Sequence, residues 1–243
     1  MKSLLVRLIG PVAALVLCFI WLPAACANYP QPLASASDIK RASADTEMIA
    51  ITDLPLRDYP LLVKFKKLKT IQYYKEHRSG ATDEKLEALA ALTFPQLHDI
   101  ELVAAKSVTD KGIRALSKMK SLTGLSLEGT SITDDACEII VSKMHLDGVN
   151  VANCGGVTLK GLLSLSKSEC LKDISFSADQ LTQEEVVRVI KAFKGITWCQ
   201  IVDPNDKLDK EAIDNLAKAK GITVVIKKQE RFRICEECNK CDR

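Results

Sequence analysis

A short pattern of apolar and polar positions recurs through the middle of the chain. It consists of an apolar residue, two variable residues, a second apolar residue, one variable residue and a third apolar residue. The last three positions alternate as they do in a strand with one buried face. From Leu97 onward the copies begin about 25 residues apart, a spacing typical of structural repeats. We predict six short strands, with apolar triplets Leu68, Ile71, Tyr73; Leu97, Ile100, Leu102; Leu122, Leu125, Leu127; Leu146, Val149, Val151; Leu171, Ile174, Phe176; and Ile196, Cys199, Ile201.

A second pattern follows each strand and predicts the start of a helix. An apolar residue precedes Thr or Asp, whose side-chain oxygen can accept a free backbone N–H of a helix N-terminus. Thr182 with Glu185 fits a capping box. Apolar residues stand four and seven positions after each cap, which places them on one helix face. The predicted caps are Thr82, Thr109, Thr133, Thr158, Thr182 and Asp209.

Each unit therefore reads as strand, turn, helix and turn, and stacking buries the apolar face of both elements. The segments LTGLSLEGTSITDDACEII (122–140) and LDGVNVANCGGVTLKGLLSL (146–165) resemble leucine-rich repeats of the longer, ribonuclease-inhibitor-like type. They are also similar to the cysteine-containing repeats of F-box-associated adaptors. The resemblance covers residues 68–226. It implies an α/β solenoid shaped as a horseshoe, with a parallel sheet on the concave face, helices on the convex face and about six repeats. It says little about function, because such folds host many roles.

The sequence departs from the family pattern at one position of the repeat. The family places Asn or Cys three residues after the last apolar strand position, and only Cys154 and Thr130 fit here. The internal side-chain ladder is therefore expected to be incomplete. The other units hold Ala105, Asp179 and Pro204 at this position.

The segments on either side of the repeats differ from them. Residues 46–67 are predicted to form an N-terminal cap, in which Ile49 and Ile51 add a strand and Leu61, Leu62 and Phe65 cover the first repeat. Residues 221–226 (GITVVI) are predicted to form a last strand. Residues 28–45 are rich in Ala, Ser and Pro and are predicted to be a flexible linker.

The first 27 residues have the layout of a bacterial-style export signal, with Lys2 and Arg7 before an apolar run and small residues at Ala25 and Ala27. Three outcomes stay open: cleavage after Ala27, lipidation of Cys26 in a lipobox-like segment, or retention as a membrane anchor. The apolar run is short for a full span of about 20 residues. We expect a protein of the periplasm, the cell envelope or the secreted space, with possible membrane attachment through its N-terminus.

Composition supports a folded protein and argues against nucleic-acid binding. The chain has 243 residues, of which 47% are hydrophobic, 27% charged and 5% aromatic. Few aromatics with many aliphatic residues suit repeated similar packing layers. The formal net charge is only +3, and so nearly balanced a charge does not predict a nucleic-acid partner.

The nine cysteines include three predicted packing residues and a terminal motif of three. Cys137, Cys154 and Cys199 occupy apolar or turn positions of the repeat and are expected to be buried. The tail, residues 227–243, contains Cys235, Cys238 and Cys241 at strict three-residue spacing. Thiolates at this spacing can bind a soft metal ion, but oxidation to disulfides suits an exported protein and is the favoured interpretation. Otherwise we expect no cofactor.

The variable strand positions point outward and form rows across the sheet, because neighbouring parallel strands lie about 4.8 Å apart. The rows supply the candidate partner-binding residues Trp198, Gln200, Asp173, Asn150, Glu101 and Asp99, with Trp198 foremost because aromatic residues are enriched at interface centres. Gly124 and Gly148 are expected to leave a trough beside Trp198. The alternative is an ordinary solvated sheet face. One predicted row is Asp99, Gly124, Gly148, Asp173 and Trp198, and the other is Glu101, Ser126, Asn150, Ser175 and Gln200.

These observations favour a binding protein over an enzyme. None of the nucleophile-elbow, phosphate-loop, zinc-protease or dinucleotide-binding motifs is present. A metal site at His98, Asp99 and Glu101 is disfavoured because adjacent strand residues point to opposite faces. We expect a non-enzymatic module that binds an unknown protein partner through the concave strand face. The alternatives are a metal-binding or redox protein that uses the cysteine tail, and a ubiquitin-ligase-type adaptor, against which the export signal argues.

Overall fold

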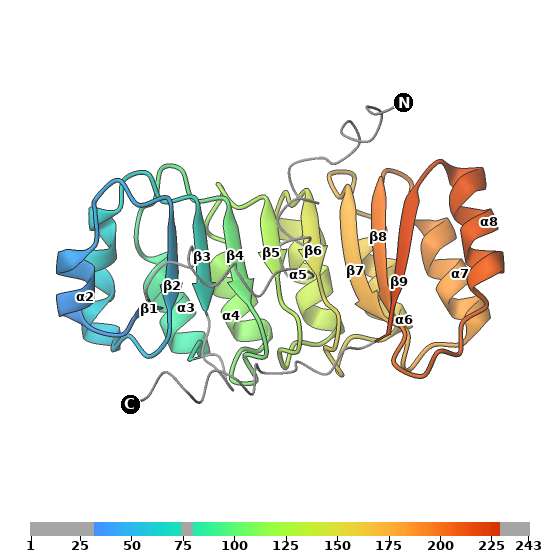
Figure 1. Cartoon of the computed structure of the whole chain (residues 1–243), viewed down its shortest axis with the longest axis horizontal. Coiled ribbons are helices and arrows are strands. Elements are labelled where there is room, and N and C mark those ends of the chain that lie inside the picture. The colour runs from blue at the N-terminus through green and yellow to red at the C-terminus, as the bar shows by residue number, and fades with distance from the viewer. Residues whose placement is uncertain (1–31, 74–79, 229–243) are drawn as a thin grey trace, which may run out of the picture. The chain divides into compact units, whose positions relative to one another are not determined.

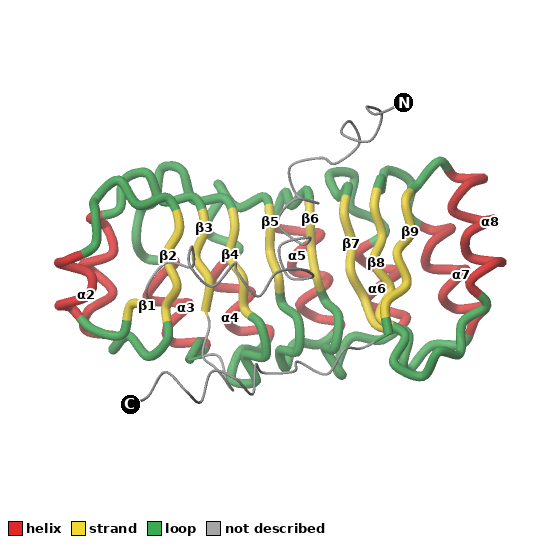
Figure 2. Tube along the Cα trace, in the orientation of Figure 1, coloured by secondary structure: helices red, strands yellow, loops and turns green. Residues whose placement is uncertain are grey.

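The computed structural model describes residues 32–73 and 80–228, and these residues form one parallel sheet backed by helices (Figure 1). Nine strands of this part of the chain follow one another across the sheet in sequence order, each parallel to the next. Figure 2 shows the strands in one layer and the helices behind them. The strands are β1 (Pro32–Leu33), β2 (Met48–Ile51), β3 (Thr70–Tyr73), β4 (Asp99–Leu102), β5 (Gly124–Ser126), β6 (Gly148–Asn150), β7 (Asp173–Ser177), β8 (Trp198–Val202) and β9 (Thr223–Lys227).

The helices begin at the caps that the sequence predicts. In each case the side chain of the predicted Thr or Asp accepts a backbone N–H of the first turn, and Thr182 with Glu185 forms the complete capping box. Six units of strand plus helix, β3–α3 to β8–α8, thus confirm the predicted number of repeats. The helices are α2 (Ala36–Arg41), α3 (Asp83–Ala90), α4 (Asp110–Leu116), α5 (Asp134–Lys143), α6 (Leu159–Leu165), α7 (Gln183–Ala192) and α8 (Lys210–Lys220), with a 3₁₀ helix η2 (Leu56–Lys64).

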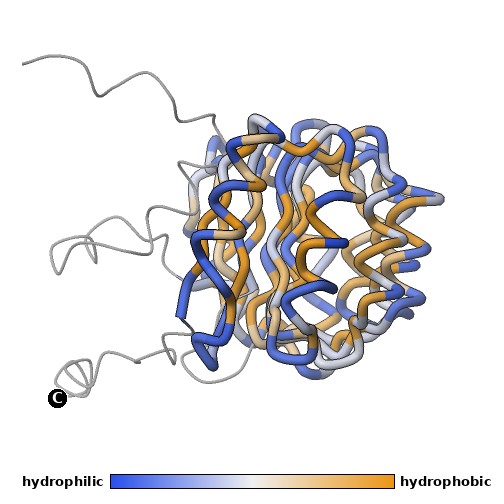
Figure 3. Tube along the Cα trace, turned by 90° about the vertical axis from the view of Figure 1, so that its right-hand side faces the viewer, coloured by the Kyte–Doolittle hydropathy of each residue, from blue (hydrophilic) through white to orange (hydrophobic). Residues whose placement is uncertain are grey.

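The core lies between the two layers and is continuous along the array. Every apolar residue of the six predicted strand triplets is buried, as are the predicted inward residues of the helices except the partly buried Leu216. Figure 3, a view onto the C-terminal end of the array, shows hydrophobic and hydrophilic stretches alternating along strands and helices. Cys137, Cys154 and Cys199 are buried, as predicted for packing residues. Thr130 and Cys154, which alone fit the family's turn position, both donate to the carbonyl oxygen of Leu127, at 2.7 and 2.9 Å.

Consecutive helices are joined by hydrogen bonds that the sequence patterns do not reveal. Asp134, the first residue of α5, accepts the backbone N–H and hydroxyl of Thr158 and the N–H of Gly161 in the next unit, at 2.8, 2.7 and 2.9 Å. Asp83 and Asp110 bind the caps Thr109 and Thr133 in the same way. We call these contacts the inter-repeat bridges. They fix the spacing of α3, α4, α5 and α6.

The segment before the repeats is folded more extensively than predicted. The linker prediction for residues 28–45 is wrong over residues 32–41, where β1 pairs with β2 and Ser35 caps α2. The helix is anchored by Ile39, which is 1% exposed, and by the Lys64 ammonium, which donates to the carbonyl oxygens of Ile39, Lys40 and Ala42 at 2.9, 2.8 and 2.6 Å. A single buried residue in a stretch rich in Ala and Ser gives no periodic signal, which explains the error.

The two predicted terminal elements are present. Ile49 and Ile51 lie in β2, and residues 223–227 form the last strand, β9. Leu62 and Phe65 cover the first repeat as predicted, but Leu61 is 38% exposed and does not. The predicted export signal with Cys26 and the cysteine tail with Cys235, Cys238 and Cys241 lie outside the described residues. Within the described residues no helix is long and apolar enough to cross a membrane.

Candidate binding surface on the strand face

The two predicted rows of outward residues are confirmed by the strand register. Asp99 pairs with Gly124, Gly124 with Gly148, Gly148 with Asp173 and Asp173 with Trp198. The second row runs in the same register from Glu101 through Ser126, Asn150 and Ser175 to Gln200. The face opposite the helices therefore brings together all six residues that the sequence predicts for partner binding.

Trp198 and Asp173 lie side by side at the C-terminal end of the first row. Both are partly exposed, and the hydroxyl of Thr197 approaches the Asp173 carboxylate at 3.5 Å. Partial burial raises the pKa of Asp173, the Thr197 hydrogen bond opposes this shift, and the charge of Asp147 adds to it. No cation forms an ion pair with Asp173 among the described residues. A partly desolvated carboxylate beside an indole ring can receive a cation.

Gln200 and Ser175 occupy the next row and are more buried than an outward position predicts, at 7% and 4% exposed. The side-chain oxygen of Gln200 has no hydrogen-bond partner in the described part of the protein. A buried acceptor without a donor is costly.

The N-terminal end of the face is acidic. His98 Nδ1 lies 2.7 Å from the Asp99 carboxylate, and the Gln72 amide donates to Glu101 at 3.0 Å. Burial, followed by the charge of Asp99, raises the pKa of Glu101, although the Gln72 hydrogen bond opposes the shift. The predicted trough at Gly124 is absent, because the Asp99 carboxylate lies over this glycine where a Cβ would stand.

The middle of the face holds a polar network. The Asn150 amide donates to the Ser126 hydroxyl and to Glu128, at 3.3 and 3.2 Å. The Asn153 amide donates to the other Glu128 oxygen at 3.0 Å, and Ser177 donates to Asn153 Oδ1 at 3.2 Å. Asn153 and Ser177 were not predicted for this face, because they follow the third apolar position of their units and lie outside the two rows. The signal that could have identified them is a polar residue one or two places after the third apolar position of a unit.

The face carries negative charge. The outward positions of β4 to β8 include the carboxylates of Asp99, Glu101 and Asp173 and no Lys or Arg. In the described part of the chain no group of three or more His, Cys, Asp or Glu is placed to hold a metal ion.

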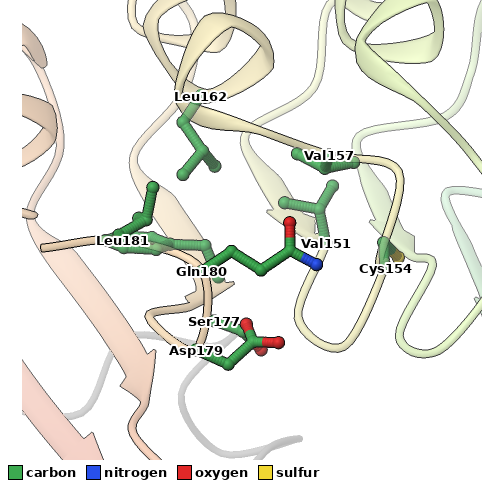
Figure 4. A pocket seen from close by; sticks show the side chains of 9 residues that line it. Val151, Cys154, Val157, Leu162, Ser177, Asp179, Gln180 and Leu181 are labelled. Atoms are coloured by element: carbon green, nitrogen blue, oxygen red, sulfur yellow. The ribbon is translucent and has the colours of Figure 1, made fainter. Parts of the chain in front are cut away.

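An enclosed small-molecule site is not formed where the chain leaves β6 and β7. Figure 4 shows Cys154, Val157, Leu162 and Gln180 around a space of about 10 Å³. That volume holds one water molecule at most. The strand face is therefore the larger surface on which polar groups are exposed to a partner.

No protein-family model and no curated protein matches the chain. Among solved structures, the crystal structure of the leucine-rich-repeat-containing protein LegL7 from Legionella pneumophila is similar at 15% identity and a TM-score of 0.44, over 76% of this chain and 77% of that chain. The parallel strand order, the register and the six capped helices define the fold by themselves. By their strand order and repeated strand–helix units, the described residues have the fold of a leucine-rich-repeat solenoid.

Proposed function

We propose that this protein is a non-enzymatic interaction module that binds a protein partner on its strand face, with Trp198, Asp173 and Gln200 at the centre of the contact. The observation that carries the proposal is the adjacency of a partly exposed indole ring and a partly exposed carboxylate that forms no ion pair within the described residues. Solenoid proteins commonly use an extended sheet face for binding.

The chemistry of this centre favours a cationic partner segment. A Lys or Arg side chain could stack on Trp198 and form an ion pair with Asp173. The remaining carboxylates on the face, at Asp99 and Glu101, would attract such a segment over a longer range. The Asn150 network would then line the contact beside this centre.

Capture of a partner from an envelope extract tests the proposal. Wild-type protein should retain a partner of reproducible identity, which is lost when Trp198→Ala is combined with Asp173→Asn and which elutes at raised salt. Lys191→Ala with Lys218→Ala changes two exposed positions on α7 and α8 and should retain it. Equal capture by the strand-face variant would contradict the proposal.

The proposal has two further parts, which concern export and the cysteine tail. We place the protein in the cell envelope or the secreted space because residues 1–27 have the composition of an export signal. The second candidate function, metal or redox chemistry at Cys235, Cys238 and Cys241, is favoured by their spacing. Intact mass of the mature protein would reveal cleavage, lipid on Cys26 and disulfides. A purified reduced protein without stoichiometric metal would exclude the metal site.

A further inference from the structure

The series of inter-repeat bridges is interrupted between α6 and α7. Helices α3, α4 and α5 each begin with an Asp that binds the cap of the following helix, but α6 begins with Leu159. The cap of α7, Thr182, instead has its backbone N–H bound by its own Glu185 at 2.8 Å. No hydrogen bond of the bridging kind joins α6 to α7 in the described residues.

A groove lies at this interruption, on the helix side of the protein. Its volume is about 370 Å³, and it is lined by Leu159, Lys160, Leu163, Ser164, Lys167 and Arg188. The first five residues come from α6 and the turn after it, and Arg188 comes from α7. The volume is within the range of binding sites, roughly 300–1,000 Å³.

The groove has an apolar floor and a basic rim. Leu159 and Leu163 are half-buried, whereas Lys160, Lys167 and Arg188 are exposed. Lys160 forms an ion pair with Glu138 at 3.3 Å on the side toward α5. No ion pair of Lys167 or Arg188 occurs within the described residues, although Glu184 stands one helical turn before Arg188.

We propose that this groove binds an acidic amphipathic helix of a partner protein. Such a helix would insert an apolar side chain between α6 and α7 and place its carboxylates against Lys167 and Arg188. Charge complementarity identifies the occupant as acidic, and the leucine floor requires that it also carry apolar residues. A membrane surface fits less well, because Leu159 and Leu163 are both half-buried and leave little apolar surface to enter a bilayer.

This site is independent of the strand face. It lies on the opposite side of the sheet from Trp198 and prefers the opposite charge. The protein would then hold a cationic segment on one face and an acidic helix on the other, as an adaptor does. Variants at one site should leave the other unaffected.

Selection from a phage-displayed library of helical peptides, with the full chain as bait, provides the probe. Enriched peptides should be acidic and amphipathic. Fluorescence anisotropy of one labelled peptide should show at least tenfold weaker binding to Lys167→Glu with Arg188→Glu, and to Leu163→Asn. The control, Lys191→Glu with Lys218→Glu, makes the same charge change on α7 and α8 outside the groove and should bind normally. Trp198→Ala should also bind normally.

Several results would overturn this assignment. Enriched peptides that are basic, or that bind both charge-reversed variants equally, would exclude the groove. Equal binding of a scrambled peptide of the same composition would show that charge alone is recognised. Binding of vesicles containing phosphatidylglycerol, lost in the groove variant and kept in the control, would assign the surface to a membrane instead.

Discussion

At the scale of single residues, the bridges between helices depend on glycines at which a Cβ would meet a carboxylate. The N–H of Gly112, the third residue of α4, donates to Asp83 at 2.9 Å. A Cβ at this position would stand 2.6 Å from the Asp83 oxygen and 2.9 Å from Leu86 Cδ1. The repeat pattern predicted the helix and its cap, but not this approach, because a contact between units leaves no periodic signal within one unit.

Gly112→Ala should therefore destabilise the protein, although alanine favours helices by about 1 kcal/mol over glycine. We expect the free energy of unfolding to fall by about 1–3 kcal/mol, since the added methyl displaces the carboxylate or strains the helix. Urea unfolding followed by circular dichroism measures the change. Gly155→Ala is the control, with nothing within 4 Å of its Cβ, and should stay within about 0.5 kcal/mol of wild type. If both substitutions lowered the free energy of unfolding equally, the contact between Asp83 and Gly112 would not explain the effect.

We expect the Asp173 carboxylate to lower the stability of the free protein at neutral pH, although the same group is proposed to bind a partner. Its pKa is raised in the folded protein, mainly by burial, so the folded state binds a proton more tightly than the unfolded chain. Stability then falls as pH rises from the ordinary Asp range through the raised folded pKa. Asp173→Asn should raise Tm slightly at pH 7, by less than about 2 °C. The difference should vanish below about pH 3.5, where both states are protonated.

Differential scanning calorimetry from pH 3 to pH 7 provides this comparison. Asp179→Asn serves as a control, because Asp179 is an exposed carboxylate outside the strand rows. If Asp173→Asn lowered Tm at pH 7, the carboxylate would be a stabilising residue, and its assignment to the binding centre would lose this support.

At the scale of elements, the sequence predicted most strands and helices because each repeats the same polar pattern. The exception is α2, where Ile39 is the only buried residue of the helix. Its stability comes from a distant side chain, since Lys64 of η2 binds three carbonyl groups at its C-terminal end. Contacts more than 20 residues apart in the chain cannot be read from local composition.

Lys64→Ala should release α2 from η2. Hydrogen bonds from charged groups contribute about 1.5–3 kcal/mol each at most, and less when partly exposed. We expect trypsin to cleave after Arg41 at least about fivefold faster, because local opening limits cleavage. Lys66→Ala also removes one trypsin site but alters an exposed lysine in the next segment, so its cleavage after Arg41 should match wild type. An unchanged rate in Lys64→Ala would mean that Ile39 alone holds the helix.

At the scale of the whole array, the bridges divide the described residues into two parts. Asp83, Asp110 and Asp134 join α3 to α6, and Gln183 accepts the Asp209 N–H at 3.1 Å to join α7 to α8. Between these parts Leu159 provides no bridge. The sheet does not add to this division, because β6 and β7 share three register pairs, as do β4 with β5 and β5 with β6. Contacts in a solenoid are made between neighbouring units, so this junction is expected to be the weakest.

Native-state hydrogen exchange read by mass spectrometry should detect this junction. Amides of β7 to β9 with α7 and α8 should exchange through a common opening that costs less free energy than the opening of β3 to β6, because separation at Leu159 breaks the sheet hydrogen bonds but no bridge between helices. Asp134→Ala removes the bridge before it and should move the boundary toward α5, whereas Asp135→Ala, an exposed neighbour, should not. One uniform opening free energy from β3 to β9 would show that core packing alone couples the units. In that case the groove between α6 and α7 would be rigid, and a partner helix would enter it without separating the two parts.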